Sequence, residues 1–145
     1  MGDNFTPQTR KNRQPRIDMQ VTVHQFFKKD QAEVKGSCGD ILGVWKGPPL
    51  TQDDIGQQYN IELCFLSQPD THVCHPTFLG FQTVVHCGKT MKFKGLVEQV
   101  YADGVIDFRL SEDLIVLLRV KNKNFNENDW ISFELDCSDV EIYPY

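Results

Sequence analysis

The sequence lacks any apolar run close to the roughly 20 residues that a membrane-spanning helix needs, and no apolar signal segment stands near its N-terminus. Its five cysteines are an odd number, so they do not indicate a framework of paired disulfides. We therefore expect an intracellular protein with reduced thiols and no membrane partner.

Sequence motifs for catalysis are missing too. There is no glycine-rich loop that would cradle a phosphate group, and there is no nucleophile elbow. Bases that a cysteine nucleophile would need are offered by His24, His75 and His86. Asp103 and Asp107 are a candidate carboxylate pair, but Asp103 precedes Gly104 and fits a turn better. We expect a protein that is not an enzyme and needs no cofactor.

The chain contains no Cys-x-x-Cys pair, which closed zinc sites usually have. The nearest approach to a zinc ligand set is Cys64, Cys74, His75 and Cys87. The competing interpretation is that Cys64 and Cys87 are small buried residues of strands, as free cysteines often are. We expect no metal, and we keep these four residues as the alternative.

Charge is unevenly distributed along the chain. The basic residues near the N-terminus are Arg10, Lys11, Arg13 and Arg16. With Asp3 they give residues 1–16 a net charge of +3, so the −5 of the whole chain leaves −8 for residues 17–145. An acidic body repels phosphate and disfavours nonspecific nucleic-acid binding. The cluster itself fits a nuclear address, a phosphate-binding arm or a solvated tail, so we favour the nucleus slightly over the cytoplasm.

Short runs of β-branched and aromatic residues alternate with turn residues from residue 19 onward. The strands predicted in the first part cover residues 19–27, 33–38, 41–46, 59–65 and 78–87. Those predicted in the second part cover residues 93–101, 105–110, 114–120, 130–137 and 140–143. Ten strands without a convincing long helix predict an all-β fold. The run at 114–118 is apolar on both faces, so we expect it to be a central strand.

The division into domains is predicted from a faint repeat. Lys35-Gly36 and Lys94-Gly95 each open a hairpin, 59 residues apart. After a disordered basic arm at residues 1–16, we expect two five-stranded, OB-like or cold-shock-like barrels in tandem. They would consist of residues 17–88 and 89–145. The alternative is one larger barrel or a sandwich.

A basic and aromatic stretch is the best nucleic-acid face that the chain offers, because single-strand binders stack bases on aromatic rings and hold the backbone with Lys and Arg. Its candidate residues are Lys89, Lys92, Lys94, Tyr101, Phe108, Arg109, Lys121 and Lys123, with Arg10, Lys11 and Arg13 from the arm. The competing interpretation places the aromatic residues in the core and makes the lysines solubilising edge charges.

Residues 94–107 resemble the opening hairpin of a cold-shock or S1-like barrel, and residues 126–134 resemble a later segment of that family. Over residues 93–142 the chain is similar to the divergent cold-shock-like domain of Armitage-type RNA-silencing helicases. The resemblance implies an OB-type barrel and a role in RNA silencing. One departure concerns activity: the family has a pattern similar to Gly-Phe-Gly-Phe-Ile, with aromatics that stack bases, where this chain has Gly104-Val105-Ile106-Asp107-Phe108.

These observations predict a β-barrel without catalytic activity that reuses its fold for protein contacts. We expect an adaptor within a nucleic-acid-handling complex, which binds a protein partner through an exposed sheet edge or the long loop at residues 47–58. One helical turn opened by Thr51 is expected in that loop. The alternative is an OB-like subunit that binds single-stranded DNA or RNA in RNA silencing or telomere capping. A third hypothesis is a zinc-stabilised module.

Overall fold

The computed structural model describes residues 19–27, 30–75, 80–86, 88–121 and 124–145. The predicted basic arm at residues 1–16 lies outside the described residues.

The described chain is all-β, as the sequence predicts. Its strands are β1 (Met19–Phe26), β2 (Gln31–Gly36), β3 (Gly39–Trp45), β4 (Gln58–Phe65), β5 (His72–Cys74), β6 (Gln82–His86), β7 (Thr90–Val100), β8 (Val105–Ser111), β9 (Leu114–Arg119), β10 (Trp130–Asp136) and β11 (Val140–Pro144). Two short 3₁₀ turns, η2 (Gln52–Asp54) and η3 (Cys137–Asp139), complete the elements. Among the described residues, no helix is long and apolar enough to cross a lipid bilayer.

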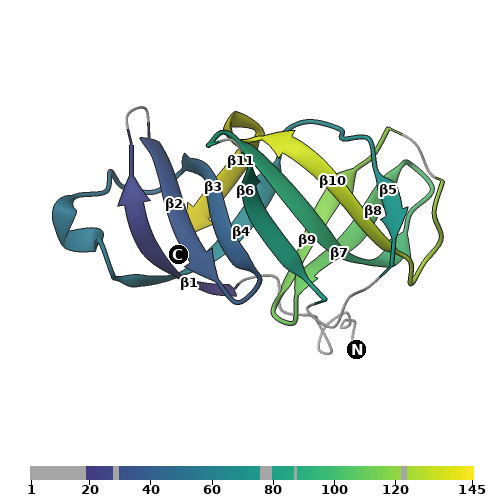
Figure 1. Cartoon of the computed structure of the whole chain (residues 1–145), viewed down its shortest axis with the longest axis horizontal. Helices are drawn as coiled ribbons and strands as arrows, with labels where there is room; N and C mark the ends of the chain where they lie inside the picture. Colours follow the sequence, from purple (N-terminus) through teal and green to yellow (C-terminus); the bar gives the residue numbers. More distant parts are fainter. Residues whose placement is uncertain (1–18, 28–29, 76–79, 87, 122–123) are drawn as a thin grey trace, which may run out of the picture.

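Five strands form a closed barrel, at the left of Figure 1. β1 pairs with β2 and β4, and β2 pairs with β3. β11 closes the ring, because it pairs antiparallel with β4 and parallel with β3. The order β4-β1-β2-β3 is that of a Greek key, in which a fourth strand returns to lie beside the first. The predicted closed five-stranded barrel is therefore present, but its last strand comes from the end of the chain.

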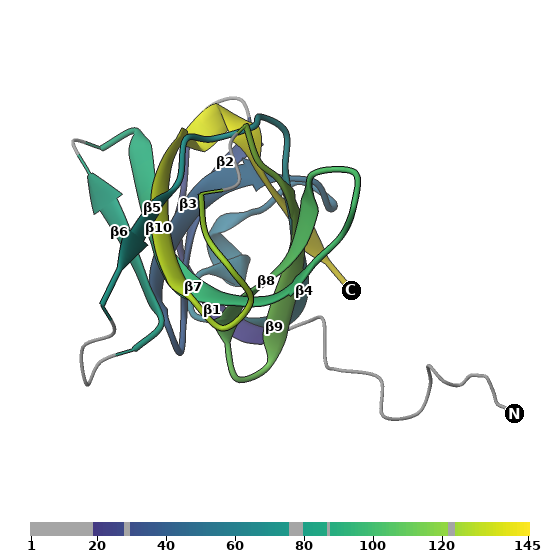
Figure 2. The same ribbon diagram turned by 90° about the vertical axis from the view of Figure 1, so that its right-hand side faces the viewer.

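The other strands are arranged around the long strand β7, which pairs with β6, β8 and β10. β8 continues to β9, and β10 continues to the short strand β5. β6 joins the two groups through the pair Gly39 and Thr83 of β3 and β6, so that all strands belong to one 11-stranded sheet. Viewed along the long axis in Figure 2, β6 lies to one side of the ring of strands. The predicted domain boundary at Gly88 stays a prediction. β11 follows this boundary in the sequence but pairs with β3 and β4, which precede it.

A β-bulge interrupts β1 at His24. The register between β1 and β2 shifts between Val23 and Gln25, so His24 is an extra residue in this strand. Up to Val23 the apolar residues of β1 are buried, as their alternation predicts. Beyond the bulge, Phe27 is 44% exposed. Strict alternation from Met19 through Val21 and Val23 predicts that Phe27 lies on the same buried face, and this prediction is wrong because the bulge ends the alternation.

β9 does not have the central position that its apolar run predicts. Leu114, Val116 and Leu118 are buried, whereas Leu117 is 65% exposed. Within the described ranges, β9 forms a ladder with β8 alone. Leu117 is an apolar residue that points outward, so the sequence of β9 looked apolar on both faces although only one face is buried.

Aromatic rings connect the barrel to the rest of the molecule. Phe65 of β4 lies 4.8 Å from Phe93 of β7 and 5.9 Å from Phe133 of β10, measured between ring centroids. Phe108 of β8 lies 5.1 Å from Phe133. Because such pairs contribute about 0.5–1.5 kcal/mol beyond the area they bury, this cluster holds strands of both groups in one core.

We predict that Gly43→Ala weakens the closure of the barrel. A Cβ atom at residue 43 would lie 2.6 Å from the backbone oxygen of Val140, so β3 and β11 would have to separate. The free energy of unfolding should fall by about 1–3 kcal/mol, as for other overpacked positions. The Lys46 amide donates to the carbonyl oxygen of Ile142 at 2.8 Å, and its hydrogen exchange should become faster.

Gly56→Ala is the matched control for this substitution. No atom lies within 4 Å of a Cβ at residue 56, but φ is +87°, so this variant measures the cost of the left-handed backbone alone. It should lower stability without changing exchange at Lys46. Unchanged Lys46 exchange in Gly43→Ala would contradict the closure that we describe.

Candidate functional site

Acidic side chains accompany Lys92 in the predicted basic face on β7. Lys92 is exposed and lies opposite Glu134 in the register of β7 and β10. A depression of about 490 Å³ beside it has a mixed lining of Asp70, His72, Lys92, Ser132, Phe133 and Glu134. Lys94 is half-buried and lies opposite Ser132. These lysines therefore do not produce a continuous positive surface.

Lys89 lies next to a further acid. The pKa of Asp136 is lowered mainly by hydrogen bonds from the amide and hydroxyl of Ser138, and the charge of Lys89 lowers it further. The Asp136 carboxylate accepts from the Ser138 amide at 2.9 Å and from its hydroxyl at 2.7 Å. A phosphate group approaching Lys89 would meet this carboxylate as well.

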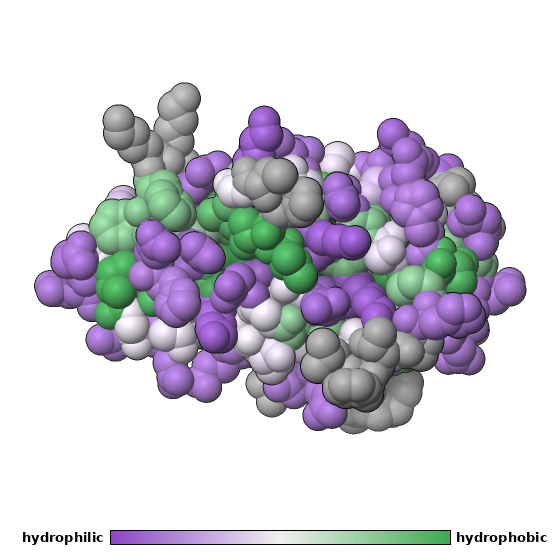
Figure 3. Space-filling view, in the orientation of Figure 1, coloured by the Kyte–Doolittle hydropathy of each residue, from purple (hydrophilic) through white to green (hydrophobic). Residues whose placement is uncertain are grey.

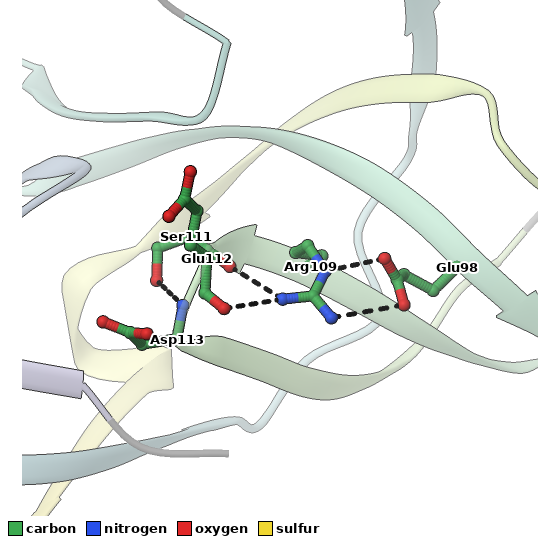
Figure 4. A network of polar contacts seen from close by, with 5 residues as sticks. All are labelled: Glu98, Arg109, Ser111, Glu112 and Asp113. Carbon is green, nitrogen blue, oxygen red and sulfur yellow. Dashed lines mark hydrogen bonds and ion pairs between the residues drawn. The ribbon is translucent and has the colours of Figure 1, made fainter. Parts of the chain in front are cut away.

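Arg109 is held by internal contacts, which Figure 4 shows. Its Nε donates to Glu98 Oε2 at 2.6 Å, and its Nη2 donates to Glu98 Oε1 at 3.4 Å. Nη1 donates to the carbonyl oxygens of Ser111 and Glu112 at 3.2 and 2.9 Å. The side chain is only 20% exposed. Arg109 thus fixes the β8–β9 turn, and its charge is compensated by Glu98.

The two aromatic candidates differ in their surroundings. Phe108 has no exposed surface and packs against Phe133, so its proposed role as a base-stacking residue is corrected: neither ring face is available. Tyr101 is 38% exposed, and its hydroxyl donates to Asp107 Oδ2 at 2.9 Å. Asp107 is the acid by which this chain departs from the cold-shock pattern. It accepts a hydrogen bond from Tyr101, the exposed one of the two aromatic candidates.

The remaining candidates are not gathered into this face. Lys121 is exposed and follows β9. Lys123, Arg10, Lys11 and Arg13 lie outside the described residues. The alternative zinc set is not assembled either: Cys64 is on β4, whereas Cys74 and His75 belong to β5 and the residue after it. These three described members do not converge on one point, and Cys87 lies outside the described residues.

The thiols whose pKa is shifted are poor nucleophiles. Burial raises the pKa of Cys38 to about 11, although the hydroxyl of Thr83 acts in the opposite direction. Burial, with a smaller effect of Glu141, also raises the pKa of Cys64. Burial and then the charge of Asp136 raise the pKa of Cys137. A catalytic thiolate requires a lowered pKa, so these three cysteines do not have the chemistry of a nucleophile.

An apolar surface that the sequence did not predict lies at the end of the β1–β2 hairpin. Phe26 and Phe27 are 37% and 44% exposed. We call this region the hairpin-tip surface and define it by Phe26, Phe27, Trp45, Pro49 and Leu50. These residues line a cavity of about 200 Å³, together with Asp30 and Gln31.

Phe27 also lines a second cavity. This cavity has a volume of about 280 Å³ and is lined by Phe27, Gln31, Glu33, Leu42, Val85 and Gly88. Figure 3 shows apolar residues gathered near this hairpin and around β6 on the same side of the molecule. Phe27 therefore lines both small cavities.

The long loop that forms one wall of the hairpin-tip surface is fixed by local hydrogen bonds. As predicted, it contains one 3₁₀ turn after Thr51. The Thr51 amide donates to Asp54 Oδ2 at 2.8 Å, and the hydroxyl of Tyr59 donates to Asp54 Oδ1 at 2.6 Å. Trp45 Nε1 donates to the carbonyl oxygen of Pro48 at 2.9 Å. These bonds hold Pro49 and Leu50 beside the hairpin.

No family model, curated protein or solved structure matches this chain.

We predict that the described thiols differ strongly in reactivity. At pH 8, a pKa of about 11 leaves on the order of one in 1,000 Cys38 side chains as thiolate. Iodoacetamide should therefore modify the exposed Cys64 at least about 10-fold faster than the buried Cys38 in the folded protein, as followed by peptide mass spectrometry. Unfolding in guanidinium should remove the difference. Equally fast labelling of both in the folded state would contradict the burial of Cys38.

Proposed function

We propose that this protein is a non-catalytic β-barrel adaptor, which binds another protein within a nucleic-acid-handling complex. The docking site is the hairpin-tip surface, and its occupant is an extended segment that inserts large apolar side chains beside Phe27. We place this complex inside the cell, with the nucleus slightly favoured over the cytoplasm. The single observation that carries the proposal is the exposure of two adjacent phenylalanines, which both line the first cavity, while Phe27 also lines the second.

The two cavities beside Phe27 are small, at about 200 and 280 Å³, whereas pockets for small molecules usually measure about 300–1,000 Å³. A wider depression of about 700 Å³, lined by His24, Gln25, Phe26, Gln52 and Ile55, adjoins the first of them at Phe26, so only the two cavities beside Phe27 lie below that range. Spaces of this size suit single anchoring side chains. Protein interfaces take most of their binding energy from a few such anchors in desolvated pockets.

Electrostatics also favour a protein partner. The part of the chain after residue 16 has a net charge of −8, and an acid accompanies each of Lys92 and Lys89. Nucleic-acid affinity depends on several unpaired basic groups that contact phosphates.

We further infer that the closed barrel is of the OB type. Five strands and Greek-key connections are features of that fold. We propose that β7, β8, β9 and β10, with β5 beside β10, form the second unit of the tandem pair, although no ladder among the described residues joins β9 to β5. Together with the resemblance of residues 93–142 to the cold-shock-like domain of RNA-silencing helicases, this supports a place in RNA silencing.

We predict that Phe27→Ser removes the bound partner. Losing an anchor of at least about 2 kcal/mol should reduce recovery of that partner at least 10-fold. The measurement is affinity purification from native tissue with the full chain, followed by quantitative mass spectrometry of wild type and variant in parallel.

Leu117→Ser is the matched control, because Leu117 is a 65% exposed apolar residue on β9. It should leave recovery of the same partner unchanged. Equal recovery with Phe27→Ser, or a loss seen only with Leu117→Ser, would disprove docking at the hairpin-tip surface.

The second candidate function is single-strand binding, favoured by the exposed side chains of Lys89, Lys92 and Lys121. A gel shift with single-stranded DNA and RNA at 50 and 200 mM salt separates it from the adaptor. We expect no salt-dependent complex, because acids accompany these lysines. A complex that weakens with salt and is lost in Lys92→Glu/Lys94→Glu would establish the second function instead.

A further inference from the structure

Three potential metal ligands meet on the outer surface of the closed barrel. His24 of β1, Glu33 of β2 and Asp40 of β3 each offer one ligand atom, and these atoms all lie within 4.8 Å of one another. This is the one convergent group of His, Cys, Asp or Glu within the described residue ranges. None of the three belongs to the zinc set that the sequence suggests.

Strand register explains why these residues meet. β1, β2 and β3 are neighbours in the sheet, and Gln25 lies opposite Glu33. His24 is the extra residue of the bulge just before Gln25, and bulges commonly redirect a side chain at functional sites. Asp40 pairs with Lys35, two positions along β2 from Glu33. Diagonal neighbours at this spacing are within reach of each other's side chains.

A second observation points to a ligand at the same place. The Oδ1 atom of Asp40 is buried, and it has no hydrogen-bond partner in the described part of the chain. A buried carboxylate oxygen without a partner is unfavourable, and an ion is one of the groups that resolve such cases. Coordination to a cation would provide the interaction that Asp40 lacks.

The surroundings of the three ligands fit a cation as well. Glu33 Oε1 accepts a hydrogen bond from Gln25 Nε2 at 3.4 Å, an outer contact of the kind that orients carboxylate ligands. The carboxylates of Glu33 and Asp40 repel each other, and a divalent cation between them removes that repulsion. Lys35 lies opposite Asp40 in the strand register, so a metal ion would compete with this ammonium group for the Asp40 carboxylate.

We propose that His24, Glu33 and Asp40 bind a divalent transition-metal ion. One imidazole nitrogen and two carboxylate oxygens are ligands that zinc accepts, at about 2.0–2.2 Å. Movements of about 1 Å by these side chains bring all three donors to that distance. Zinc should bind more tightly than manganese, following the general order of divalent affinities. Three protein ligands leave a coordination position open to water or to a side chain of a partner.

This site neighbours the hairpin-tip surface, because only Gln25 separates His24 from Phe26. A bound ion would connect the bulge of β1 to β2 and β3, and so fix the direction in which the hairpin leaves the barrel. The inference does not rest on the adaptor role, since zinc binding is measured without a partner.

The test is a titration of the chelator-stripped full chain with Zn²⁺ by isothermal titration calorimetry. We expect one equivalent to bind saturably, and His24→Ala and Glu33→Gln each to weaken binding at least 10-fold. His72→Ala is the matched control, because His72 is an exposed histidine of β5, and it should leave binding unchanged. Circular dichroism shows whether each variant keeps the β-sheet spectrum, and the isosteric Glu33→Gln carries the test if His24→Ala does not fold.

Thiols are the competing ligands, so Cys64→Ser/Cys74→Ser is titrated in parallel and should bind zinc like the wild type. Cobalt in place of zinc should give a spectrum without a thiolate-to-metal charge-transfer band. The proposal is overturned if no saturable binding is seen, if His24→Ala and Glu33→Gln bind as the wild type does, or if the cysteine variant loses the ion.

Discussion

β11 pairs with β3 through a parallel ladder and with β4 through an antiparallel one, and closure of the barrel depends on this double contact. Without it, both strands would present unpaired backbone groups at an edge. The contact is close enough to require glycine at residue 43. Phe65, at the end of β4, then packs against rings of β7 and β10. Closure of the barrel and joining of the two strand groups therefore occur at the same place.

The all-β fold and most strands were predictable, because alternation of apolar residues is a local property of the chain. β1 up to Val23 and all of β10 show it clearly, and their buried residues are those expected. Strand partners are a different matter: nothing local in β11 indicates that it pairs with β3, almost 100 residues away. β5 has only three residues and gives no pattern. The bulge at His24 adds only one residue to β1. An insertion of one residue does not change the composition of the strand, so the sequence does not reveal it.

The candidate sites show the same contrast between local patterns, which the sequence reveals, and contacts between strands, which it does not. The sequence identified lysines that are exposed, but it gave neither the acids opposite them nor the contacts that hold Arg109. The sequence does not say whether Phe108 points outward or into the core, and the structure shows that it is buried. The hairpin-tip surface was missed because strict alternation placed Phe27 inside. The His24, Glu33 and Asp40 group comes from three strands and depends on register, which no spacing in the chain encodes.

The position of β11 in the chain also bears on how the protein folds. Residues 140–144 must find residues 61–65 before the barrel exists, so its completion depends on contacts of high sequence separation. Such contacts slow folding, because loop-closure entropy is lost before they form. In the meantime the hairpin of β1, β2 and β3 can form from near neighbours, and β3 and β4 wait with open edges. Until β11 is in place, these unpaired edges are the part of the barrel open to pairing with other chains.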